Sequence, residues 1–154
     1  MENQDEKCHK KFAVELFNQT WQLLEAPNRG EDDNENMLQS AYASCYHWRQ
    51  VGTAIHQARG EWMISHVTAV LGRSEAALHH AQRTLSLCEQ NGFGDFDLAF
   101  AYEAMARALA ASGNRDGFAR YFALAEKAAE SIAEAEDKKI FSESLAAGPW
   151  YDMR

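Results

Sequence analysis

Six histidines are the residues of this sequence most suited to holding a metal ion. A carboxylate-bridged di-iron site in a helix bundle needs a Glu-x-x-His pair on each of two helices, and the sequence has one such pair, Glu6 and His9. His79 and His80 are adjacent, so on a helix they point about 100° apart and are poorly placed to chelate one ion. We therefore predict no metal site and no cofactor. No nucleophile elbow, phosphate loop or dinucleotide fingerprint occurs, and we assign no catalytic residue.

A second group that could do chemistry is the aromatic run Tyr46, His47 and Trp48. Together with Arg59, these side chains could line a pocket for a small ligand or a substrate, with the His47 imidazole acting as an acid or a base. The alternative is that Tyr46 and Trp48 pack between helices while His47 hydrogen-bonds a neighbouring helix. We favour packing, and keep a small-ligand-binding protein or enzyme as the second hypothesis.

The balance of charge narrows the classes of partner. The formal net charge is −8, and the sequence contains no stripe of basic residues. Nucleic acids and anionic membrane surfaces attract basic proteins, so we expect neither as a partner. No apolar run approaches the roughly 20 residues that span a bilayer, and the polar start of the chain lacks the apolar core of a signal peptide. These features predict a cytoplasmic protein.

The elements that position these residues are helices. Apolar residues recur every three or four positions along almost the whole chain, which is typical of amphipathic α-helices, and no segment alternates long enough to be a strand. The pattern predicts one all-α domain, 1–154, of about seven helices. It comprises antiparallel helical hairpins at about 7–52, 54–92 and 95–133, a terminal helix at about 135–146 and an aromatic tail at 147–154.

Several single residues predict local features of the helices. Gly60 lies inside the third helix and costs about 1 kcal/mol relative to Ala, so it marks a late start, a bend or a close helix contact. Asp32 and Glu35 have the spacing of a capping box at the start of the second helix. Cys45 and Cys88 fall on apolar stripes, and we expect them to be buried free thiols.

Two segments of the chain resemble each other at an offset of 41 residues, when Gly72 is aligned with Gly113. In each, a helix with a small residue ends at glycine, a polar turn follows, and a second amphipathic helix begins. The residues that fit this pattern are Ser65, Leu71, Gly72 and Ala77 in the first unit and Ala106, Gly113 and Ala125 in the second.

This pattern of helices that end at glycine resembles the tetratricopeptide-repeat family. The resemblance covers about 55–133 and is weak over 7–52. Phe118 and Thr84 depart from the small residues that the family pattern favours. The usual unit has 34 residues, so the offset of 41 implies longer helices or turns. The resemblance implies a short α-solenoid, in which hairpins stack to cover each other's apolar surface.

The resemblance also implies that the first helix of each hairpin lines a concave groove. That would place Arg59, Trp62 and His66 in the groove from one hairpin, and Phe100, Glu103 and Arg107 from the next. Arginine and aromatic side chains suit a peptide that carries a carboxylate. The alternative is that Glu103 and Arg107 pair on a solvated face. We therefore predict a scaffold that binds a peptide or protein partner.

The tail residues Trp150 and Tyr151 follow a helix stop at Gly148 and Pro149. A bare aromatic tail lowers solubility. We expect it either to dock on its own chain or to form the contact of a homodimer.

Overall fold

The computed structural model describes residues 3–154, and all of its regular structure over that range is helical. The predicted all-α fold is thus confirmed. The helices are α1 (Gln4–Glu25), α2 (Glu31–Val51), α3 (Ala54–Val70), α4 (Ser74–Asn91), α5 (Asp95–Ala111), α6 (Arg115–Glu130) and α7 (Ala135–Ala146). None of the helices described is long and apolar enough to cross a bilayer.

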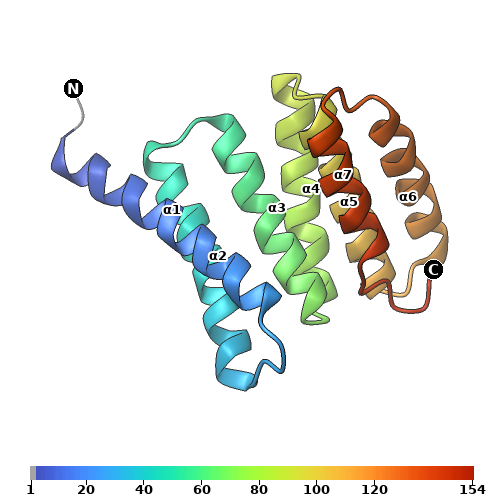
Figure 1. Ribbon diagram of the computed structural model, residues 1–154, viewed down its shortest axis with the longest axis horizontal. Helices are drawn as coiled ribbons and strands as arrows, with labels where there is room; N and C mark the ends of the chain where they lie inside the picture. The colour runs from blue at the N-terminus through green and yellow to red at the C-terminus, as the bar shows by residue number, and fades with distance from the viewer. Residues whose placement is uncertain (1–2) are drawn as a thin grey trace.

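Consecutive helices pair as antiparallel hairpins, α1 with α2, α3 with α4 and α5 with α6 (Figure 1). The second helix of each hairpin packs on the first helix of the next, so that α2 contacts α3 and α4 contacts α5. The first helices also contact each other along the stack, α3 with α5 and α5 with α7. The start of α1 extends away from the stack, and α7 covers α5 at the other end (Figure 1).

Two glycines end the first helices of the second and third hairpins, as the sequence predicts. Gly72 and Gly113 have φ angles of 75° and 79°, in the left-handed region that glycine tolerates best. This geometry turns the next amide back onto the helix. The N–H of Arg73 donates to the carbonyl of Thr68, and that of Asn114 donates to Leu109. Such bonds satisfy carbonyls that a helix end leaves open.

The expected capping box of α2 is displaced by two residues. The backbone N–H of Gly30 donates to Oδ2 of Asp33 at 3.0 Å, so the reciprocal carboxylate comes from Asp33 and not from Glu35. The turn from Pro27 ends two residues earlier than the sequence pattern suggests, so the helix already starts at Glu31. Glu31, Asp32 and Asp33 then lie in the first turn, where negative charge is favourable.

Small residues let the helices approach closely. An added Cβ at Gly60 would lie 2.9 Å from Sγ of Cys45, so of the three expectations for Gly60 the close helix contact is correct. Cys45 and Cys88 are buried free thiols, as expected. Hydroxyl groups cross the hairpins as well, because Ser44 donates to the Ala13 carbonyl and Thr84 to the Ala58 carbonyl. Thr84, at a position where the family pattern favours a small residue, thus uses its hydroxyl to join α3 and α4.

The C-terminal tail docks on its own chain, the first of the two expectations for it. Trp150 is buried between the rings of Phe118 and Phe122, and its Nε1 donates to the carbonyl of Leu145 at 3.0 Å. The hydroxyl of Tyr151 donates to the carbonyl of Ala69 on α3. The tail therefore joins α7 to the second and third hairpins.

Candidate binding groove

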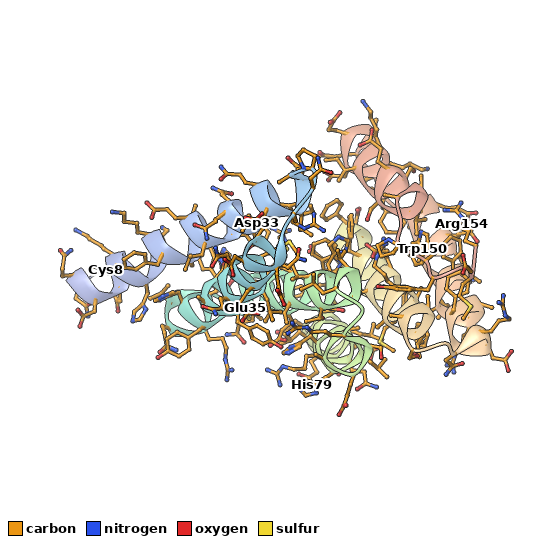
Figure 2. The ribbon with its side chains drawn as sticks, turned by 90° about the horizontal axis from the view of Figure 1, so that it is seen from below. Cys8, Asp33, Glu35, His79, Trp150 and Arg154 are labelled. Atoms are coloured by element: carbon orange, nitrogen blue, oxygen red, sulfur yellow. The ribbon has the colours of Figure 1, made fainter. Side chains whose placement is uncertain are left out.

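A cavity of about 760 Å³ lies on the face formed by the first helix of each hairpin and by α7. In Figure 2, α1 and α7 stand on either side of α3 and α5. All four of these helices contribute lining residues, and Thr84 of α4 adds one more. Several rim residues are exposed, among them Glu25, Arg59 and Ile140, so the cavity opens to solvent as a groove.

Aromatic rings form one wall of the groove. Trp62 lies at the centre of this wall, with its ring centroid 5.9 Å from Trp21 and 4.9 Å from His66 in stacked arrangements. Phe100 meets the Trp62 ring edge-on at 5.3 Å, and Phe96 lies 4.6 Å from Phe100. Rings from α1, α3 and α5 thus form a continuous apolar surface in a cavity of a size that suits a ligand or an anchoring side chain.

Two polar atoms in this wall have no partner. Within residues 3–154, Nε1 of Trp62 and Nδ1 of His66 are the buried side-chain nitrogen or oxygen atoms that make no hydrogen bond. An unsatisfied buried donor or acceptor costs about 1–3 kcal/mol. Burial and the positive charge of Arg107 lower the pKa of His66 to about 3, so this imidazole is neutral at physiological pH.

Arg59 reaches across the groove to α5. Its Nε and one terminal nitrogen donate to both carboxylate oxygens of Asp97, at 2.9 and 3.1 Å. The hydrogen bonds to the Asp97 carboxylate, and more weakly the charges of Asp97 and Asp137, raise the pKa of the Arg59 guanidinium. Since the Arg59 side chain is 54% exposed, this pair contributes little to stability, but it occupies the planar face that a ligand carboxylate would need.

Glu103 departs from both sequence-based expectations, and its pair with Arg107 is buried. The two residues pair at i, i+4 with 3.0 Å between Arg107 Nε and Glu103 Oε1, but their side chains are 0% and 1% exposed. Glu103 does not line the groove and does not face solvent. The hydroxyl of Ser144 donates to its second oxygen at 3.2 Å. The reason is that α7 folds over this face of α5, which the helical spacing alone does not reveal.

Arg107 lines the inner end of the groove, and four of its five N–H groups are engaged. Besides the bond to Glu103, three N–H groups donate to the carbonyls of Ser144, Ala147 and Pro149 at 3.1–3.3 Å. Its guanidinium carbon lies 4.1 Å from the centroid of the Trp150 ring. Arg107 therefore holds α7 and the tail in place, and it has no free pair of N–H groups with which to bind a ligand carboxylate through both oxygens.

The structure brings five of the six expected groove residues to one cavity: Arg59, Trp62, His66, Phe100 and Arg107. The sequence-based prediction did not include α1, where Phe17 and Trp21 line the groove. Their i, i+4 spacing was a usable signal. It also missed Asp137 and Glu143 on α7, because no pattern indicated that α7 would complete the groove.

The structure places the three residues proposed for the alternative pocket in different surroundings. Trp48 stacks on His56 with 4.2 Å between ring centroids, and Nδ1 of His47 lies 2.8 Å from Nδ1 of His9 on α1. Tyr46 is 58% exposed. None of the three lines either of the two cavities described here. The contacts of His47 and Trp48 with α1 and α3 agree with the packing interpretation, but Tyr46 does not pack between helices as that interpretation expected.

A second, shallower depression of about 640 Å³ lies beside a chain of hydrogen-bonded groups. The buried carboxylate of Glu61 accepts from His80 Nδ1 at 2.6 Å and from Arg83 Nε at 2.8 Å, and His80 Nε2 lies 3.2 Å from the Tyr42 hydroxyl. Burial and the charge of Glu61 raise the pKa of Tyr42, so its hydroxyl stays neutral at physiological pH. These hydrogen bonds link α2, α3 and α4. His79, on the rim, lies on the side of the molecule away from α1 and α7 (Figure 2).

No three His, Cys, Asp or Glu side chains converge as a metal site in the described part of the chain. Scans of this chain against models of known protein families, against curated proteins and against solved structures found no match.

Proposed function

We propose that this protein is a tetratricopeptide-repeat-like scaffold that binds a peptide segment of a partner protein in the groove between α1 and α7. The observation that carries the proposal is the aromatic wall, in which Trp62 Nε1 and His66 Nδ1 are buried without partners. Native proteins satisfy nearly all such groups. Both atoms are buried in the wall, so an occupant reaches them only if the rings shift on binding; a peptide, with backbone N–H and C=O groups, then supplies both a donor and an acceptor.

The engaged arginines change the kind of peptide that this scaffold would take. Arg59 is bidentate with Asp97, and Arg107 is bound to Glu103 and three carbonyls. Neither guanidinium can bind both oxygens of a ligand carboxylate without breaking these bonds. The proposal therefore rests on aromatic anchoring, by which a few bulky side chains supply most of the affinity, and not on carboxylate capture.

We also propose that the protein works in a reducing compartment such as the cytoplasm. Cys8 is exposed, Cys45 and Cys88 are buried, and all three are free. Disulfides persist mainly in oxidising compartments, so an odd number of unpaired thiols fits a reducing one.

Selection from a displayed library of random linear peptides tests the groove assignment. Peptides enriched on the wild-type protein are re-measured on Trp21→Ala, which removes one ring from the groove wall, and on Tyr46→Ala, which removes an exposed ring outside the groove. We expect affinity to fall at least about tenfold for Trp21→Ala and to be unchanged for Tyr46→Ala. No enrichment, or equal affinity for all three proteins, would contradict the proposal.

A further inference from the structure

The charges around the groove are not balanced. Its four lining carboxylates are Glu25, Asp97, Asp137 and Glu143, and its two lining cations are Arg59 and Arg107. Asp97 neutralises Arg59, and Glu103, behind the wall, neutralises Arg107. Among residues 3–154, no salt bridge involves Glu25, Asp137 or Glu143. Three carboxylates therefore face the groove without a positively charged partner in contact.

The aromatic wall lies between these carboxylates. Glu25 comes from the end of α1, one turn beyond Trp21, while Asp137 and Glu143 come from α7 on the other side. His66 adds no positive charge, because burial and Arg107 keep its pKa near 3. The faces of Trp21, Trp62 and Phe100 attract cations through their ring quadrupoles. The carboxylates and the aromatic rings thus both favour a positively charged ligand.

The unpartnered indole nitrogen of Trp62 further limits the kinds of ligand that fit the groove. Trp62 is 9% exposed, lines the groove, and has an N–H that needs an acceptor. A simple amine or polyamine carries only donors when it is charged, so it cannot satisfy this group. A peptide carries backbone carbonyls as well as charged side chains.

We propose that the groove recognises a basic peptide segment, in which Lys or Arg flanks an aromatic or large aliphatic anchor. The anchor packs on the Trp21 and Trp62 rings, and the cations face Glu25 on one side and Asp137 and Glu143 on the other. This inference rests on the proposed function and names the chemistry of its partner. The net charge of −8 acts in the same direction at long range, because it speeds the approach of a basic partner.

The test compares two variants with the same net charge. Glu25→Gln/Asp137→Asn/Glu143→Gln removes the three groove charges, and Glu89→Gln/Glu126→Gln/Glu130→Gln removes three exposed charges that do not line the groove. Peptides selected on the wild-type protein are sequenced, and their affinities for the three proteins are measured by fluorescence anisotropy at low and high salt.

We expect the groove-dependent peptides to be rich in Lys and Arg beside an aromatic or Leu residue. Their affinity should fall roughly tenfold for the groove triple variant at low salt, and less at high salt, while the control triple variant changes it about twofold or less. Groove-dependent peptides that are neutral or acidic, or an equal loss in both triple variants, would overturn the basic-peptide inference alone. A set of peptides that bind Trp21→Ala as well as wild type would overturn the groove function, and this inference with it.

Discussion

Trp21 and Trp62 stack on each other, yet their removal has different consequences for the fold. Trp62 is 9% exposed and contacts rings from three helices. We expect Trp62→Ala to lower the free energy of unfolding by about 3–5 kcal/mol, because it opens a cavity in the core. Trp21 is half-buried, so Trp21→Ala should cost less than about 2 kcal/mol. Urea unfolding of both variants measures the difference. A cost below about 1 kcal/mol for Trp62→Ala would contradict the placement of the Trp62 ring in the core.

Arg107 is the residue on which the closure of the C-terminal end depends. In Arg107→Met, Glu103 would remain buried without its cation, and three carbonyls of α7 and the tail would lose their donor. Breaking a buried ion pair from one side costs about 3–5 kcal/mol. We expect a loss of that size in the free energy of unfolding, measured by urea denaturation.

The double variant Glu103→Gln/Arg107→Met is the control for this assignment. It leaves no uncompensated charge in the interior, so it should be more stable than Arg107→Met alone. A double variant that is less stable than Arg107→Met would mean that Glu103 contributes through contacts other than the ion pair.

Helix contacts depend on Gly60, where α3 meets α2. On helix propensity alone, Gly60→Ala would stabilise the protein by about 1 kcal/mol. The new methyl group would lie 2.9 Å from Cys45 Sγ and 3.3 Å from its Cα, and overpacking of this kind costs about 1–3 kcal/mol. We expect Gly60→Ala to destabilise the protein in thermal and urea unfolding. Cys45→Ala should recover part of the loss in the double variant, and a stabilising Gly60→Ala would contradict the close contact.

Glu61 links α3 to α4 and makes this contact sensitive to pH. Burial alone would raise the pKa of Glu61, but the hydrogen bonds from His80 and Arg83 lower it below the ordinary value of 4.5. A carboxyl group whose pKa is lower in the folded state stabilises that state above the ordinary pKa, and the stabilisation is lost as pH falls through the folded value. We expect Glu61→Gln to destabilise the protein at pH 7 and the difference from wild type to shrink below pH 4.5. A difference that is constant over this range, measured by urea unfolding, would contradict the shift.

The sequence predicts elements well where the signal is local. Gly72 and Gly113 end helices because a left-handed residue is needed at each position, and glycine is the residue that supplies it. The position of Asp33 in the cap of α2 is harder to predict, because several carboxylates lie in the first turn of this helix and the exact end of the preceding turn decides between them.

Contacts between elements that are distant in the sequence were harder to predict from the sequence. The helical spacing of Arg59, Trp62 and His66 correctly places them on one face, since that depends only on the helix period. The burial of Glu103 depends on α7, about forty residues later, and no short-range pattern reports it. His47 and Trp48 had the right chemistry for a site, but His9 and His56 pack against them from helices whose register the sequence leaves open.

At the scale of the whole molecule, the groove is a consequence of how the hairpins stack. The second helices, α2 and α4, pack between successive first helices, so the first helices and α7 share one face. The tail fixes α7 there through Trp150 and Arg107. Binding in this groove would therefore involve residues from the first helix to the last, and its footprint should extend along the stack.

Hydrogen exchange with and without a selected peptide tests the central claim most directly, because it locates the binding face without a mutation. We predict that the bound peptide slows amide exchange in the C-terminal half of α1, in α3, at the start of α5 and in α7, all of which line the groove. Exchange in α6 and in the α4 segment around His79 should be unchanged. Protection confined to α2, α4 or α6 would place the binding site on the opposite face and contradict the account.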